Sequence, residues 1–176
     1  MPDLARQYTV DEVLAFPEDG NRYELVDGEL LVTPSPRQPH QAVLSRLHLA
    51  VGPFVRDHAV GQVFFAPADV FWQATEYVQP DLFVVPTNQV TGDWRDITTL
   101  LLAVEVVSPA SSRADRLAKR RLYQRMGVPT YWVVDPDARL VEVWQPDDER
   151  PEIVTERLTW RPADAPELVI ELTEIW

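Results

Sequence analysis

The chain has 176 residues, 45% of them hydrophobic, which is enough for one domain with a substantial core. It has no cysteine, which excludes disulfides, thiolate nucleophiles and cysteine zinc sites, and its net charge of −12 would repel a polyanion over most of the surface. No N-terminal apolar run resembles a signal peptide, and no stretch reaches the ~18 apolar residues of a membrane span. We therefore expect one cytoplasmic domain, residues 1–176, that does not enter a membrane.

Turn residues and hydrophobic periodicity predict a fold in which strands outnumber helices. Thr9 and Glu12 form a capping box that opens a short helix. Asp27-Gly28 is a hairpin signal, and Gly52-Pro53 predicts a kink or an early end of the second helix. The predicted elements are helix 9–16, strands 22–26 and 29–33, helix 43–55, strands 62–72, 77–85 and 100–107, helix 111–126, and strands 130–134, 140–144, 153–157 and 168–172.

One strand–helix–strand unit, residues 100–134, sets the fold class. Ser111 or Ser112 can cap its helix, and Gly127 occupies the stop position. Two strands joined through one helix make a parallel crossover. We therefore expect an α+β fold, with a central mixed β-sheet flanked by helices.

Two carboxylates interrupt apolar strands. Glu105 lies between Val104 and Val106, where an ionised carboxylate is costly to desolvate unless it is paired, protonated or bound to a metal. Asp81 follows Pro80 at the start of another apolar segment, although Asp is a poor strand former. Structural explanations stay open, because Glu105 can face a wet edge or pair with an arginine, and Pro-Asp is also an ordinary turn.

Lys119 is the only lysine among sixteen basic residues. If its helix returns along the sheet, Lys119 lies about 10 Å behind the turn and Glu105 about 7 Å behind it, so a lysine stem can join them. Asp115 and Tyr123, four residues to either side of Lys119, share its helix face. A compact ammonium suits orienting a water or stabilising an oxyanion.

Positive charge is concentrated in the same helix. The segment 111–125 has six basic residues and one acidic residue, a local charge of +5, which leaves −17 for the rest of the chain. A single lysine that happens to lie in a basic helix is therefore the structural alternative for Lys119. The six basic residues are Arg113, Arg116, Lys119, Arg120, Arg121 and Arg125.

Two acids and a lysine suggest one reaction. Asp and Glu oxygens can hold a hard divalent ion such as Mg²⁺ or Mn²⁺ and leave positions for water and a phosphate. The metal lowers the pKa of the water, and the lysine positions the nucleophile, which predicts phosphodiester hydrolysis. Hydrolysis of a sugar by two carboxylates would leave Lys119 without a role.

Longer strings of the sequence resemble a known family. RYELVDGELLV, VQPDLFVV and AVEVVSPASSRADRLAKRRLYQRMGVPTYWVVDP, in that order, are similar to the Uma family of bacterial endonucleases, long classed as a domain of unknown function. Pro80-Asp81, Glu105 and Lys119 resemble the PD-(D/E)XK nuclease superfamily. The resemblance covers roughly residues 8–144 and implies a restriction-endonuclease-like core.

The resemblance also implies roles for single residues. Asp81 and Glu105 would be the metal-binding carboxylates for Mg²⁺ or Mn²⁺, and Lys119 would be the catalytic lysine. The superfamily places a lysine two residues after the second acid, but Val106-Val107 stand there, so the lysine would have moved to the following helix. Glu24 is a further candidate for an outer metal or water contact.

Other accessory residues stay open at the level of the sequence. Glu24 is also compatible with a solvated strand residue. His40 suits either a phosphate contact or the start of a helix. Asp115 and Tyr123 enter as accessory candidates through the helix face that they share with Lys119.

Two classes of function follow. The first is a metal-dependent endonuclease that acts on nucleic acid, most simply DNA, as a homodimer with two basic helices lining one cleft. The second is a catalytically silent nuclease-fold module for interaction or regulation, which the acidic charge favours.

Overall fold

The computed structural model describes residues 6–108 and 111–176. Its α-helices are α1 (Val10–Leu14), α2 (Gln38–Asp57) and α3 (Arg120–Arg125), and a π-helical segment, Ala114–Lys119, leads directly into α3. The strands are β1 (Arg22–Val26), β2 (Glu29–Thr33), β3 (Gln62–Phe65), β4 (Val70–Gln73), β5 (Glu76–Val78), β6 (Leu82–Val85), β7 (Leu102–Val106), β8 (Tyr131–Asp135), β9 (Leu140–Trp144), β10 (Glu152–Val154), β11 (Arg157–Trp160) and β12 (Leu168–Glu171). Short 3-10 turns cover Thr87–Gln89, Trp94–Asp96 and Leu172–Glu174.

The strands form three sheets. A six-stranded sheet has the order β10-β9-β8-β7-β6-β3, a four-stranded sheet has the order β2-β1-β5-β4, and β11 pairs with β12. β7 and β8 run parallel, with Glu105 opposite Val133, while β7 is antiparallel to β6. The predicted parallel crossover and the mixed α+β fold are therefore confirmed.

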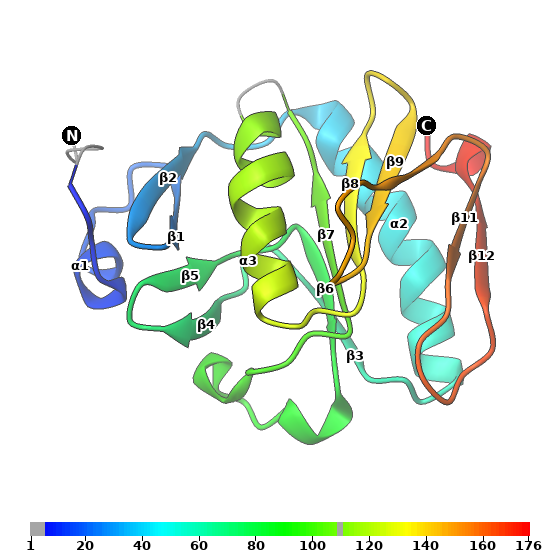
Figure 1. The fold of residues 1–176 in the computed structure, drawn as a ribbon, viewed down its shortest axis with the longest axis horizontal. Helices are drawn as coiled ribbons and strands as arrows, with labels where there is room; N and C mark the ends of the chain where they lie inside the picture. The colour runs from blue at the N-terminus through cyan, green and yellow to red at the C-terminus, as the bar shows by residue number, and fades with distance from the viewer. Residues whose placement is uncertain (1–5, 109–110) are drawn as a thin grey trace.

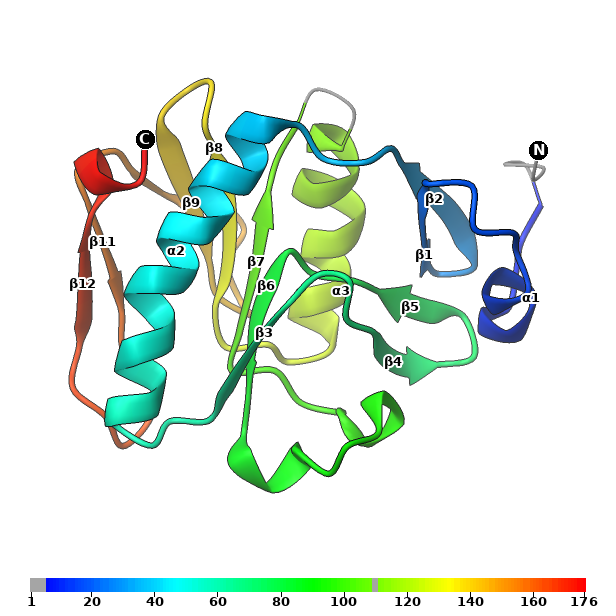
Figure 2. The same cartoon turned by 180° about the vertical axis from the view of Figure 1, so that it is seen from behind.

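Helices cover both faces of the six-stranded sheet. Figures 1 and 2 show α3 against one face and α2 against the other. Leu47 of α2 packs in one core with Val104, whereas Leu122 of α3 packs in a second core with Ala103. Because side chains alternate along β7, Glu105 points to the same face as Ala103 and therefore toward α3.

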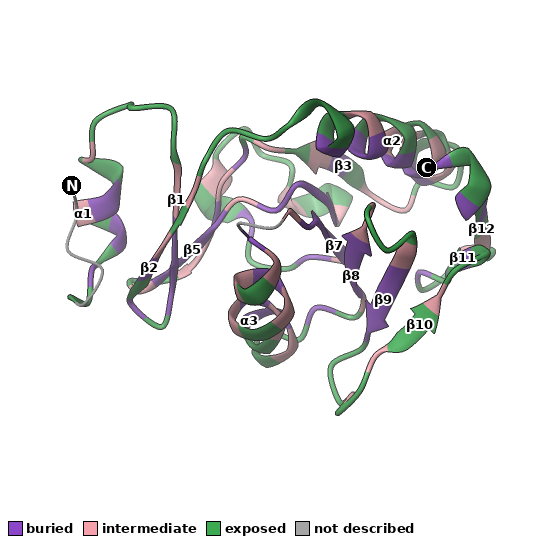
Figure 3. Ribbon diagram, turned by 90° about the horizontal axis from the view of Figure 1, so that it is seen from above, coloured by how far each residue is buried: buried purple, intermediate pink, exposed green. Residues whose placement is uncertain are grey.

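The four-stranded sheet lies beside α3 rather than α2. Seen from above in Figure 3, β1, β2 and β5 lie on one side of α3 and the six-stranded sheet lies on the other. Val26 and Val78 of the smaller sheet belong to the same buried core as Leu122. The two sheets thus enclose one face of α3 and its π-helical segment. Side chains on that face are buried between the sheets.

Two predicted strands are wrong in extent. Residues 62–72 and 77–85 each divide into two strands that belong to different sheets: β3 and β6 pair in the large sheet, and β4 and β5 in the small one. The divisions fall at Pro67 and at Pro80, which have no N–H for a ladder hydrogen bond. The predicted strand 153–157 likewise spans the end of β10 and the start of β11.

The helices also differ from their predicted bounds. α2 begins at Gln38 and continues through Pro53 to Asp57. Pro53 is exposed, so water can bond the carbonyl that the proline leaves without a donor. The predicted helix 111–126 is π-helical over Ala114–Lys119, a distortion that the apolar spacing does not indicate.

No helix within residues 6–108 and 111–176 is both long and apolar enough to cross a membrane. α2, a helix of 20 residues, has an exposed face that includes Arg46 and Arg56. The cytoplasmic location stays a prediction.

Candidate functional site

Charged side chains are buried where the two sheets meet the π-helical segment. Glu24, Glu105, Asp115 and Lys119 are each at most 1% exposed. Lys119 Nζ lies 2.8 Å from Glu24 Oε2 and 3.0 Å from Glu105 Oε1. It lies 3.3 Å from Asp115 Oδ1. One ammonium group therefore meets three carboxylates that come from β1, from β7 and from its own helical segment.

Glu105 uses only one of its two carboxylate oxygens within this cluster. Oε1 accepts hydrogen bonds from Lys119 Nζ at 3.0 Å and from the Tyr123 hydroxyl at 2.9 Å. Oε2 is buried and has no hydrogen-bond partner among the described residues. Burial raises the pKa of Glu105 well above its ordinary value, and nearby carboxylates add to this effect, while Lys119 opposes it.

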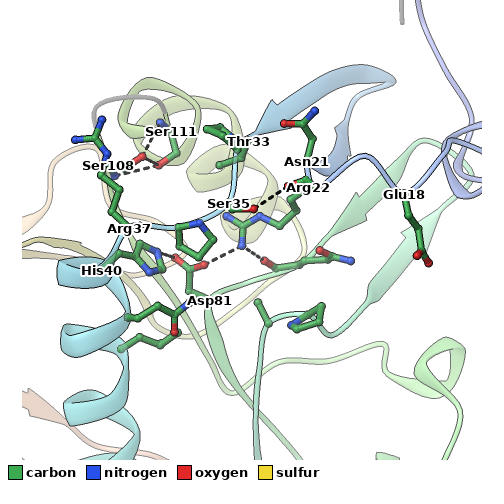
Figure 4. A pocket seen from close by; sticks show the side chains of 18 residues that line it. Glu18, Asn21, Arg22, Thr33, Ser35, Arg37, His40, Asp81, Ser108 and Ser111 are labelled. Carbon is green, nitrogen blue, oxygen red and sulfur yellow. Dashed lines mark hydrogen bonds and ion pairs between the residues drawn. The ribbon is translucent and has the colours of Figure 1, made fainter. Parts of the chain in front are cut away.

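Asp81 immediately precedes β6, the strand beside β7, and both of its oxygens are occupied. Oδ1 accepts a hydrogen bond from Arg22 Nη1 at 2.8 Å. Oδ2 accepts a hydrogen bond from His40 Nε2 at 3.0 Å (Figure 4) and another from the Val106 amide at 2.8 Å. Burial opposes ionisation, yet the His40 hydrogen bond and the Arg22 charge hold the pKa of Asp81 below its ordinary value. Asp81 is thus a fixed, ionised carboxylate.

Arg22 links Asp81 to the carboxylate cluster, and the sequence prediction omits it. It lies two residues before Glu24 on β1, so the two side chains share a face. Its Nε lies 3.6 Å from Glu24 Oε2 while its Nη1 contacts Asp81. The backbone amide of Gln79 donates to Glu24 Oε1 at 2.8 Å. The spacing of two residues between Arg22 and Glu24 on a predicted strand was the signal in the sequence that their side chains lie on the same face.

Negative charge exceeds positive charge in this group of side chains. Four carboxylates face two permanent cations, so with all four ionised and His40 neutral the group has two uncompensated negative charges. Burial opposes this full ionisation by raising the pKa of Glu105 and that of Asp115. Burial alone would lower the pKa of Lys119, but the three carboxylates raise it above its ordinary value. Lys119 is therefore held as an ammonium ion and does not act as a general base. The carboxylates are Glu24, Asp81, Glu105 and Asp115, and the permanent cations are Arg22 and Lys119.

The donor set suits a hard divalent cation. Proteins commonly hold Mg²⁺ through one or two carboxylates, with waters and substrate oxygens filling the other positions. Glu105 Oε2 offers an oxygen without a partner, and a divalent ion would offset the excess negative charge. In the described part of the chain no three His, Asp or Glu side chains are arranged to hold a metal ion. Both oxygens of Asp81 already accept hydrogen bonds, so Asp81 would bind a metal ion together with Glu105 only by giving up its contact with Arg22 or His40.

A pocket of about 620 Å³ opens beside Asp81. Asp81, Arg22 and His40 line it together with residues of the loop before α2 (Figure 4). Glu105 and Lys119 do not contribute to its described lining. A substrate in this pocket therefore reaches Asp81 first, and the Glu105–Lys119 pair lies deeper in the protein.

The structure brings together every residue that the sequence singled out. Glu24 is fully buried, so it is not a solvated strand residue. His40 lies in the first turn of α2 and also contacts Asp81, which makes it both a helix-start residue and part of the site. Asp115 and Tyr123 contact Lys119 and Glu105, respectively. Their catalytic roles stay predictions.

The basic helix contributes less free charge to the surface than its sequence suggests. Arg116 forms ion pairs with Asp135 and Glu142, at 2.7 and 2.5 Å. Arg125 pairs with Asp27 at 2.8 Å. These arginines are already neutralised by carboxylates of the same chain. Two arginines of this helical segment, Arg113 and Arg121, are exposed and form no ion pair with a described carboxylate.

The mixed sheet, with Asp81 just before β6, Glu105 within the adjacent β7 and Lys119 on the following helical segment, has the arrangement of the restriction-endonuclease-like fold. The Uma2 family model, described as "Putative restriction endonuclease", matches residues 10–159. The chain therefore belongs to this family, as the resemblance of its sequence predicts.

A solved structure supports the fold. It is described as a "putative nuclease belonging to DUF820" from Anabaena variabilis ATCC 29413 and superposes with a TM-score of 0.79 at 22% sequence identity. The similarity covers 96% of this chain and 97% of that one. At this identity the similarity shows a shared fold. No curated protein matches the chain.

Proposed function

We propose that this chain is a divalent-metal-dependent endonuclease that hydrolyses phosphodiester bonds of DNA. The observation that carries the proposal is the arrangement at Glu105, where Oε2 has no partner and Oε1 is held by Lys119 within a buried group of excess negative charge. The family and the fold support the nuclease class. The metal and the choice of DNA are inferred from the chemistry of these side chains.

Each residue has a distinct task in this proposal. Asp81 and Glu105 would hold Mg²⁺ or Mn²⁺, which when bound offsets negative charge on a phosphate and lowers the pKa of a bound water. Lys119, held as an ammonium, orients the attacking water and stabilises the charge that develops on phosphate oxygen. Tyr123 fixes the Glu105 side chain through its 2.9 Å hydrogen bond.

Cleavage of plasmid DNA and of labelled oligonucleotides with Mg²⁺ or Mn²⁺ tests the proposal. We expect cleavage that chelation abolishes, and a loss of at least about 100-fold in Glu105→Gln. Glu152→Gln, at an exposed position of β10, is the matched control and should cleave normally. A purified, folded protein that cleaves no DNA with either metal would contradict the proposal.

The alternative is a nuclease-fold module without turnover. The observation that favours it is Asp81, whose two oxygens are already taken by Arg22, His40 and a backbone amide. Titration with Mn²⁺ separates the two functions. An active site should bind Mn²⁺ and lose affinity in Asp81→Asn, whereas a vestigial site should bind weakly and respond little to that change.

We also propose that the protein acts as a homodimer. An acidic chain gains a more positive cleft when two copies place their exposed arginines, such as Arg113 and Arg121, along one groove. Sedimentation at micromolar concentration tests this state. A monomer under those conditions would contradict it without touching the proposed chemistry.

A further inference from the structure

The pocket beside Asp81 has an exposed cation at its edge. Arg37 lines the pocket, and its side chain forms no hydrogen bond or ion pair with any described residue. Figure 4 shows its side chain beside His40, where α2 begins. Arg22, which also lines the pocket, is already bound to Asp81. Arg37 is therefore the arginine of this pocket that remains available to an anion.

The N-terminus of α2 adds to the same end of the pocket. Arg37 is the N-cap residue of this 20-residue helix, no side chain caps it, and its first turn has no acidic residue. The first amides of a helix have no partner within the helix, and the aligned peptide dipoles favour negative charge there. Pro39, the second residue of α2, has no N–H, so the amides of Gln38 and His40 are those that can bind a phosphate here. Arg37 and the start of α2 thus suit a phosphate.

His40 holds the Asp81 carboxylate at the wall of the pocket. It is 9% exposed, lines the pocket, and its buried Nδ1 has no hydrogen-bond partner among the described residues. Because ionised Asp81 can only accept, His40 Nε2 must carry the proton of their 3.0 Å hydrogen bond. In the neutral ring Nδ1 is then an acceptor. This nitrogen is enclosed by protein, so His40 serves the pocket by fixing Asp81 rather than by contacting a ligand through Nδ1.

The size and walls of the pocket fit a nucleotide. Its volume of about 620 Å³ lies within the range of sites that enclose a small organic molecule. Pro34, Pro36, Pro67 and Leu44 give it apolar wall surface. A sugar and a base can lie against this surface while their phosphate lies at Arg37. The combination of a cationic end and apolar walls matches the phosphate, and the sugar and base, of one nucleotide.

We infer that this pocket binds one nucleotide of a single strand of DNA, with its phosphate at Arg37 and the N-terminus of α2. The inference rests on the proposed nuclease function and names its substrate as single-stranded DNA. Nucleotides of an intact duplex are stacked and paired, so they enter a pocket only after they are turned out of the helix, at a cost of a few kcal/mol. A single strand avoids that cost.

The charge of the chain leads to the same substrate. Duplex binding usually depends on many Lys and Arg contacts to phosphates. The net charge is −12, and Arg116 and Arg125 are paired within the chain. A single strand that enters one pocket needs few phosphate contacts, because its bases and sugars contribute to binding. We therefore expect a shallow dependence of affinity on salt.

Fluorescence anisotropy with a labelled oligo(dT) of about 12 nucleotides tests the inference, with a duplex of the same length as the comparison. Both are measured with chelator present, so that no cleavage occurs. We expect the single strand to bind at least about tenfold more tightly than the duplex. Arg37→Ala should weaken single-strand binding about tenfold and reduce the slope of log K against log salt by about 0.7.

Arg150→Ala is the matched control, because Arg150 is an exposed arginine between β9 and β10, outside the pocket lining and outside the proposed dimer groove. Its affinity for oligo(dT) should stay within about twofold of the unchanged protein. Tighter binding of the duplex, or equal effects of Arg37→Ala and Arg150→Ala, would overturn the inference. So would the absence of binding to either DNA.

The outcomes also separate this inference from the proposed function. Arg37-dependent binding of single-stranded DNA without cleavage in Mg²⁺ or Mn²⁺ would contradict the nuclease activity and support the pocket. Metal-dependent cleavage of duplex that Arg37→Ala leaves unchanged would support the nuclease activity and contradict the pocket.

Discussion

At the scale of the residue, the feature that matters most is a buried lysine surrounded by carboxylates. Lys119 meets Glu24, Glu105 and Asp115 within 3.3 Å. Ion pairs at this depth are costly to desolvate and are rarely the cheapest way to stabilise a fold. Their placement in the interior of a nuclease-family protein is therefore better explained by a site than by stability.

Replacement of Lys119 should strongly destabilise the fold. Lys119→Met leaves three buried carboxylates without their shared cation and should destabilise the fold by about 3–5 kcal/mol. Adding Glu24→Gln removes one of these charges, so the double variant should recover part of the loss. Urea unfolding of the single and double variants measures this coupling. Strictly additive effects would show that Lys119 and Glu24 do not interact.

Replacing Asp115, in contrast, should stabilise the fold. Burial raises its pKa above the ordinary value, more than Lys119 lowers it, so the folded state binds the proton more tightly than the unfolded chain does. Stability therefore falls as the pH rises from the unfolded pKa of about 3.9 toward the folded value. Asp115→Asn should unfold at higher urea than the unchanged protein at pH 7, and the gain should vanish below about pH 4.

Asp147→Asn is the control for that measurement, since Asp147 is exposed. Its urea midpoint should match that of the unchanged protein at both pH values. A lower midpoint for Asp115→Asn at pH 7 would mean that the Lys119 contact outweighs the cost of burying the Asp115 charge.

At the scale of the element, β7 and the helical segment that follows could be predicted, and so could the proximity of Glu105 to Lys119. An apolar strand, a cap and a stop glycine are local signals. The rise per residue of a strand and of a helix then gives the distances of Glu105 and Lys119 from the turn that joins the two elements. The split of 62–72 and of 77–85 could not be predicted, because a proline marks an interruption without telling which sheet each half joins. Arg22 was missed because its partner Asp81 is far away in the sequence.

The position of α2 gives a prediction about its buried face. Leu47 is fully buried against the six-stranded sheet, whereas Leu49 is 69% exposed on the other side of the same helix. Leu47→Ala should cost about 2–5 kcal/mol of unfolding free energy. Leu49→Ala should stay within about 0.5 kcal/mol. Urea unfolding measures both, and similar midpoints would contradict the described packing of α2.

At the scale of the whole molecule, the site depends on both sheets at once. β1 supplies Arg22 and Glu24, and the six-stranded sheet supplies Glu105. Anything that binds the folded site and not the unfolded chain must stabilise the entire protein. A bound metal ion should therefore raise the temperature at which the whole protein unfolds.

Mn²⁺ at about 100 times its dissociation constant should add about 2.7 kcal/mol of stability. For a chain of this size, that corresponds to a rise in Tm of roughly 5–10 °C. The rise should be absent in Glu105→Gln and present in Glu152→Gln, and calorimetry measures it. An equal rise in both variants would place the metal elsewhere on the protein.

The contact of Lys119 with Glu24 also sets an order of events during synthesis. Glu24 leaves the ribosome early, and Lys119 follows only after three of the six strands of the larger sheet, β3, β6 and β7, have been made. Until then Glu24 and Glu105 have no ammonium between them and repel each other. The nascent chain therefore cannot complete the charge pairing of this cluster before Lys119 has been made, when β8 to β12 are still to come.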